Sequence, residues 1–162
     1  MKIVVLKFGG TSVGTIEKIK KVTDIIIEHK KKKNKVIVVS SAMSGVTNDL
    51  IKKSKQISNN FIDSEYDVLV SSGEQVACSL IAGRLNHKGF KSRSWLGWQI
   101  PIFTNGPYTN SRIQQVNKNK LLRFLKEGGI PIITGFQGVN MNERVTTVSY
   151  THLRAHETSR DL

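Results

Sequence analysis

The sequence contains few of the residues that mark secreted, membrane-spanning or disulfide-rich proteins. Its 162 residues include one cysteine, three prolines and 12 acidic residues, against 25 lysines and arginines. The single cysteine, Cys78, excludes an internal disulfide and fits a reducing compartment. No apolar run approaches the roughly 20 residues that span a bilayer, and the first residues lack a signal-peptide pattern. We therefore expect a cytoplasmic protein without membrane contact.

The shortage of acidic residues leaves a formal net charge of +13, which raises the possibility of a nucleic-acid partner. Five lysines, however, gather in one short run at a predicted helix end, between Lys30 and Lys35. Cations at that position suit the helix dipole. No aromatic residue interleaves with this run, so it offers no platform for base stacking. The sequence therefore predicts no nucleic-acid partner.

The first fourteen residues carry the strongest local signal. Ile3–Leu6 is a continuous apolar run that predicts a buried parallel strand, and Lys7 stands at its carboxyl end. The adjacent Gly9 and Gly10 allow backbone dihedrals closed to other residues, so that several N–H groups can point at one anion. A helix predicted from Thr15 to about Lys32 adds its positive N-terminus. This arrangement predicts a phosphate-binding turn, although glycine pairs also occur in plain turns.

Lys7–Gly14 reads KFGGTSVG and resembles the opening signature of the aspartokinases, within the amino-acid kinase superfamily. The KFGG part is shared more widely in that superfamily, whereas TSVG points to aspartokinases. The resemblance implies an α/β fold, a three-layer αβα sandwich with a mainly parallel central sheet. It also implies that ATP is the phosphate ligand and that Lys7 is the catalytic residue. The residues that the resemblance places on the ATP phosphates are Lys7, Phe8, Gly9, Gly10, Ser12 and Ser41.

The second motif follows a predicted buried strand at Lys35–Val39. Ser41–Asn48 is small and rich in hydroxyl groups, and a helix is predicted at Asp49–Ile57 with Thr47 or Asn48 as its N-cap. The residues by themselves fit either a ligand loop or a plain cap. The stretch resembles the second aspartokinase motif, which implies that Thr47 contacts the amino-acid substrate.

A third motif, SSGEQ at Ser71–Gln75, precedes a helix predicted from Gln75 to about His87. A carboxylate at a helix N-terminus is usually there for favourable electrostatics alone, and spacing by itself favours that interpretation. The motif resembles the aspartokinase segment whose glutamate holds the substrate's α-ammonium group. The resemblance therefore implies this role for Glu74.

Two tryptophans, Trp95 and Trp98, could stack an adenine, but core packing is the favoured interpretation. An amphipathic helix is predicted at Asn117–Glu127 and a buried strand at Ile130–Thr134, followed by a hairpin with its tip at Asn142-Glu143. Gly135–Gly138 resembles a motif that lines the aspartate pocket. This resemblance adds Phe136 and Gln137 to the predicted substrate site.

The resemblance ends after residue 147. Residues 148–162 do not continue the family pattern, and we interpret them as a foreign tail of artefactual origin. A zinc-protease motif needs a glutamate next to the first of its two histidines, and here Glu157 follows the second, after His152 and His156. Residues 1–147 then correspond to the N-terminal part of an aspartokinase catalytic domain, and we expect this fragment to be inactive alone.

The implied activity is transfer of the ATP γ-phosphate to the side-chain carboxylate of L-aspartate, giving 4-phospho-L-aspartate. This reaction is the first step of lysine, threonine and methionine biosynthesis. The acceptor carboxylate has an ordinary pKa of about 3.9, so it needs no general base. Mg²⁺ is expected on the ATP oxygens, held by phosphates and water more than by protein ligands, and the full-length form is expected to be a homo-oligomer. The alternatives are another amino-acid kinase, for acetylglutamate, carbamate or UMP, or a non-catalytic phosphate-binding fragment.

Overall fold

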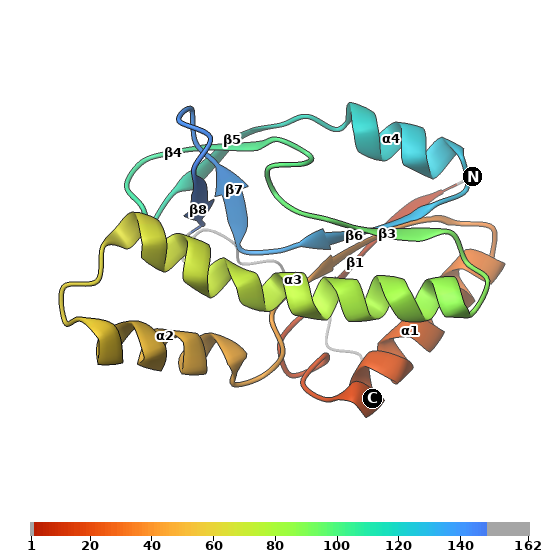
Figure 1. The fold of residues 1–162 in the computed structure, drawn as a ribbon. Helices are drawn as coiled ribbons and strands as arrows, with labels where there is room; N and C mark the ends of the chain where they lie inside the picture. Colours follow the sequence, from red (N-terminus) through yellow and green to blue (C-terminus); the bar gives the residue numbers. More distant parts are fainter. Residues whose placement is uncertain (1, 149–162) are drawn as a thin grey trace.

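The computed structural model describes residues 2–148, and its main sheet has four parallel strands (Figure 1). Helices α1 and α3 cover one face of this sheet and α4 covers the other, which gives three layers (Figure 1). The predicted αβα architecture with a mainly parallel sheet is confirmed. In spatial order the strands are β1 (Ile3–Phe8), β2 (Lys35–Ser40), β6 (Ile130–Thr134) and β3 (Ser92–Trp95). Along the chain the helices are α1 (Ile16–Lys31), α2 (Val46–Ile57), α3 (Asp63–His87) and α4 (Asn119–Lys126).

A second, mixed sheet lies beside the first and was not predicted. Its order is β5-β4-β7-β8, with β4 parallel to β7 and the two outer pairs antiparallel. Its strands have only three to five residues, too few for a periodic pattern to stand out. They are β4 (Ile102–Asn105), β5 (Arg112–Val116), β7 (Gln137–Val139) and β8 (Val145–Thr147).

The prediction that the first strand is buried was wrong, since every residue of β1 is exposed or half-buried. Within residues 2–148, β1 is an edge strand that pairs with β2 alone, and its side chains alternate between exposed and half-buried. Leu6 and Phe8 pack against the core beneath α1 and α3, whereas Ile3 and Val5 are 48% and 61% exposed on the opposite face. The uniform apolar run could not indicate which side chains would be exposed. Ile3 and Val5 are exposed because α4, the helix on their face of the sheet, packs against β6.

The helix predicted to begin at Gln75 instead begins at Asp63, so Glu74 lies in the interior of a 25-residue helix. The serines before Glu74 keep their hydroxyls inside the helix: Ser71 and Ser72 donate to the carbonyls of Val68 and Leu69. No helix within residues 2–148 is both long enough and apolar enough to cross a membrane.

Asp67, on α3, joins this helix to the second sheet. Its buried carboxylate accepts the backbone N–H groups of Thr109 at 3.0 Å and Thr147 at 2.9 Å, and the Thr147 hydroxyl at 2.7 Å. Since a buried carboxylate is costly unless its oxygens are hydrogen-bonded, these donors fix where β8 lies relative to α3.

Two glycines of α3 provide a matched test of the packing between α3 and the loop after β2. A Cβ added at Gly73 would stand 2.9 Å from Ala42 Cβ and 3.2 Å from Val46 Cγ1, whereas one at Gly83 would meet nothing within 4 Å. We expect Gly83→Ala to raise the free energy of unfolding by about 0.5–1 kcal/mol, because alanine loses less backbone entropy in a helix. We expect Gly73→Ala to lower it by about 1–3 kcal/mol through overpacking. Urea denaturation measures both, and equal stabilisation by the two changes would contradict the tight contact at Gly73.

Candidate active site

The loops that follow β1, β2 and β6 meet at the carboxyl edge of the main sheet. The Ser41 N–H donates to the Phe8 carbonyl at 3.0 Å, and the Gly135 N–H donates to the Ser40 carbonyl at 2.9 Å. Because the carboxyl ends of parallel strands share one edge, segments far apart in the sequence form a single surface there. The structure therefore brings together the first and second predicted motifs.

The glycine turn after β1 is shaped by close approach and not by unusual dihedrals. Neither Gly9 nor Gly10 has a positive φ, which differs from the conformational reason predicted from the sequence. A Cβ on Gly10 would lie 3.0 Å from the Ala42 carbonyl oxygen, while one on Gly9 would meet nothing within 4 Å. Lys18, which the sequence did not single out, holds the turn by donating from its ammonium to the Thr11 carbonyl at 2.9 Å. The turn is thus held in place on one side, while the space next to Gly9 is open to a ligand.

Lys7 is an exposed residue of β1, directly opposite Val39 of β2. The alternation of the strand places it on the same side as Ile3 and Val5, away from the core under α1. Three ion pairs form within residues 2–148, and none includes Lys7. Its ammonium charge is therefore not neutralised by a carboxylate of the described chain.

Glu74 is the buried ionisable group of this region, with 1% of its surface exposed. Its Oε1 accepts the Ala42 N–H at 3.1 Å, and its Oε2 is buried with no hydrogen-bond partner in the part of the chain that the structure describes. Burial raises the pKa of Glu74 to about 7, although the backbone N–H groups act in the opposite direction. The burial of Cys78 and the nearby charge of Glu74 raise the pKa of that thiol to about 12. One oxygen of Glu74 is thus left to accept a donor from outside the described residues.

Thr47 lies in the first turn of α2 and is half-buried. The prediction that Thr47 or Asn48 caps this helix was wrong. The helix begins at Val46, and its N-cap is Gly45, which has a φ of 85° and offers no side-chain hydrogen bond. Glycine suits this position because left-handed backbone is strained for other residues. The helix therefore starts before Thr47, so its hydroxyl is not used as an N-cap.

The last two predicted site residues, Phe136 and Gln137, lie just after β6. Phe136 is half-buried with a left-handed φ of 62°, an uncommon conformation for a residue with a side chain. The buried amide of Gln137 donates to the Ser71 carbonyl at 3.1 Å and accepts the Gly97 N–H at 3.5 Å. These bonds tie β7 to α3. A contact of Phe136 or Gln137 with aspartate stays a prediction.

Comparison with known proteins identifies the chain. A model of the amino acid kinase family matches residues 2–152. The chain belongs to the amino acid kinase family. It is 46% identical to an aspartokinase of Geobacillus stearothermophilus over 148 residues, which cover 91% of this chain and 36% of that protein. It is 44% identical to an aspartokinase of Rickettsia conorii over 151 residues, covering 91% and 38%. This family member thus spans a little over a third of the length of the curated relatives that it matches.

Solved structures agree with this assignment. The aspartate kinase from Synechocystis superimposes with a TM-score of 0.71 at 32% identity, covering 93% of this chain and 24% of that one. Escherichia coli aspartokinase III in complex with aspartate and ADP superimposes with a TM-score of 0.78, covering 93% and 44%, and its 21% identity supports the fold alone.

The structure describes one residue beyond residue 147, where the sequence predicts that the family resemblance ends. Val148 is buried, and its N–H donates to the Phe136 carbonyl at 2.9 Å, so ordered pairing continues one residue beyond that boundary. Residues 149–162 lie outside the described part of the structure. That they form a foreign tail stays a prediction.

Proposed function

We propose that this chain is part of an aspartate kinase, which transfers the γ-phosphate of ATP to the side-chain carboxylate of L-aspartate. The observation that carries the proposal is Glu74, a buried carboxylate with an unpartnered oxygen beside the loop that meets the glycine turn. Relatives that share 46% and 44% of their residues with it are named aspartokinases, which supports the same assignment.

In this proposal Glu74 binds the α-ammonium group of aspartate. A buried carboxylate has a raised pKa because no cation offsets its loss of hydration. An ammonium group placed against Oε2 supplies that charge and a hydrogen bond together. Thr47, from the first turn of α2, is the proposed second contact to the amino acid, with Phe136 and Gln137 as further contacts.

Lys7 and the glycine turn are proposed to hold the ATP phosphates, with Phe8, Gly9, Gly10, Ser12 and Ser41 as the surrounding contacts. The acceptor is a carboxylate that is ionised at neutral pH, so catalysis depends on bringing one anion up to another. An ammonium group that no described carboxylate neutralises suits that task, because it offsets charge on the transferring phosphoryl group.

Mg²⁺ is the cation that this reaction uses with ATP, and it lowers the charge of the phosphates. No group of three or more histidine, cysteine, aspartate or glutamate residues within residues 2–148 could hold a metal ion. We propose that Mg²⁺ is held by the nucleotide phosphates and by water more than by protein ligands, as is usual for this cation. We further propose a cytoplasmic homo-oligomer that performs the first step of lysine, threonine and methionine biosynthesis.

A chimera tests the activity, since the chain spans only part of its relatives. Residues 1–147 would replace the matching segment of the Geobacillus stearothermophilus aspartokinase, and ADP release would be followed with aspartate, acetylglutamate or UMP as acceptor. We expect turnover with aspartate alone, trapped by hydroxylamine as the acyl phosphate, and loss of that turnover with Glu74→Gln. Turnover with another acceptor would favour a different amino-acid kinase. We expect residues 1–162 alone to show none, and robust aspartate-dependent turnover there would contradict the fragment hypothesis.

A further inference from the structure

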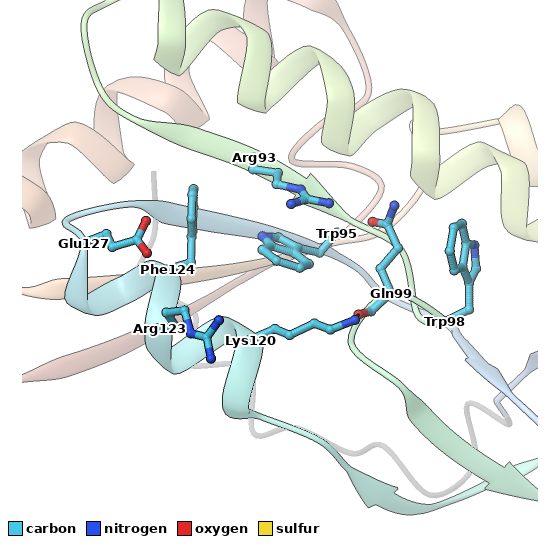
Figure 2. Close-up of a pocket in the computed structure, with 8 residues that line it drawn as sticks. All are labelled: Arg93, Trp95, Trp98, Gln99, Lys120, Arg123, Phe124 and Glu127. Atoms are coloured by element: carbon cyan, nitrogen blue, oxygen red, sulfur yellow. The ribbon is translucent and has the colours of Figure 1, made fainter.

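A cavity of about 550 Å³ lies between β3, the turn that follows it, and α4 (Figure 2). It is on the face of the main sheet opposite α3, and its lining contains none of the residues of the candidate active site. Trp95 and Phe124 form its inner wall, with ring centroids 5.8 Å apart at an interplanar angle of 71°. This size is typical of pockets that bind small molecules.

The charges around the cavity favour an anion. Arg93, Lys120 and Arg123 all line it, and none of them forms an ion pair within residues 2–148. Glu127 is the acidic residue of the lining, and it is already paired with Lys91 at 2.7 Å. The Lys120 ammonium donates one N–H to the Gln99 carbonyl at 3.2 Å. Guanidinium groups match the geometry of carboxylate and phosphate oxygens, so Arg93 and Arg123 present donors for an oxyanion.

The aromatic residues favour a planar ring on that anion. Trp98 is 51% exposed at one end of the cavity, and Arg123 lies toward the other end (Figure 2). Trp95 is 5% exposed, and its indole N–H is buried without an acceptor in the described part of the chain. The Arg93 guanidinium lies over the Trp95 ring, 4.1 Å from its centroid. An exposed indole face can stack a ring, and a buried N–H without an acceptor is costly.

We propose that this cavity binds a small organic anion, in which a planar ring stacks on Trp98 and a carboxylate or phosphate group is held by Arg93, Lys120 and Arg123. The favoured interpretation of both tryptophans as core residues holds for Trp95 and is wrong for Trp98. The site is independent of the proposed kinase activity, because it shares none of the residues assigned to ATP or aspartate.

Intrinsic fluorescence tests the proposal directly on residues 1–162, because the chain has two tryptophans and both line this cavity. The probes are phenyl phosphate and phenylacetate, with inorganic phosphate and phenol as controls for charge alone and ring alone. We expect a saturable change with at least one of the two ring-bearing anions, at concentrations where the controls give none. The tighter probe identifies the anionic group. A response to phenol equal to that of both anions, or no saturable response, would overturn the proposal.

Matched variants of α4 then locate the site. We expect Arg123→Gln to weaken binding about tenfold through loss of charge-assisted hydrogen bonds. Lys126→Gln makes the same charge change on the same helix outside the cavity lining, and we expect little effect on binding. Equal weakening by the two would show a general charge effect and reject the site. Circular dichroism confirms folding, and Lys120→Gln serves as the second test if Arg123→Gln fails to fold.

Discussion

Replacing Lys7 by alanine is expected to lower kcat about 10³-fold in the chimera that joins residues 1–147 to the remainder of the Geobacillus stearothermophilus aspartokinase. Lys7 ends the exposed side of β1, and no carboxylate within residues 2–148 pairs with it. Its proposed partner is the transferring phosphoryl group, whose negative charge shifts as the transition state forms. The loss should therefore fall on kcat more than on the KM for aspartate.

Lys2→Ala is the matched control for this prediction. Lys2 is exposed beside the start of β1, and its backbone carbonyl accepts the Lys35 N–H at 2.9 Å whatever its side chain. We expect near-normal kcat in this variant, measured by coupled ADP release. If Lys7→Ala also retained near-normal kcat, Lys7 would have no catalytic role, and the glycine turn would have to hold the phosphates without it.

The second large effect is on stability and needs only the chain itself. Burial raises the pKa of Glu74 from 4.5 to about 7 in the folded protein. Between these values the folded state holds a proton that the unfolded state has released, so folding becomes less favourable as pH rises. We expect the contribution of Glu74 to the free energy of unfolding to fall by about 3 kcal/mol from about pH 4 to about pH 8, since each pKa unit is worth about 1.36 kcal/mol. Urea denaturation across this range measures it.

Glu74→Gln isolates that contribution, because the amide keeps the shape of the side chain and cannot ionise. We expect the fall assigned to Glu74 to disappear in this variant. Glu17→Gln is the contrasting control: backbone and Thr15 hydrogen bonds lower the pKa of exposed Glu17, so its removal cannot abolish a fall with rising pH. A Glu74→Gln curve parallel to that of the unmodified chain would show that Glu74 ionises as freely when folded as when unfolded.

This pH dependence also bears on the proposed substrate site. Aspartate brings an ammonium group, and a cation beside a buried carboxylate favours the ionised form. If Glu74 binds that group, the energy lost by ionising in the free protein is partly recovered in the complex. The same burial that weakens the folded chain at neutral pH therefore makes Glu74 a selective acceptor for a cation.

Local patterns were sufficient where one element determines its own structure. The helix after the glycine turn begins where Thr15 predicts, and the Thr15 hydroxyl accepts the Lys18 N–H at 3.2 Å. The strand at Ile130–Thr134 is buried throughout, and a hairpin joins β7 to β8 at the predicted turn. These features depend on neighbours within a few residues, so composition and spacing specify them.

Patterns failed where the deciding contact is distant in sequence. The motif at Ser71–Gln75 led us to begin the helix at Gln75, yet the helix runs through it and brings Gly73 against Ala42 and Val46. The apolar run of β1 indicates burial, yet β1 lies at a sheet edge whose outer face no helix of the described residues covers. The role of Asp67 in anchoring β8 had no sequence signal, since its donors Thr109 and Thr147 are 42 and 80 residues away.

The sequence by itself determined the first two strands and the helix between them, the glycine turn and the motifs by which the family can be recognised, because each is a pattern of neighbouring residues. Only the tertiary structure decided that Glu74 is buried with one oxygen unpartnered, and that two tryptophans and three cations surround a cavity near α4. Both depend on which surfaces of the sheet and helices come together. The way these surfaces pack determines how much water reaches each charged group. A charged group that loses water is stabilised more by a partner of opposite charge.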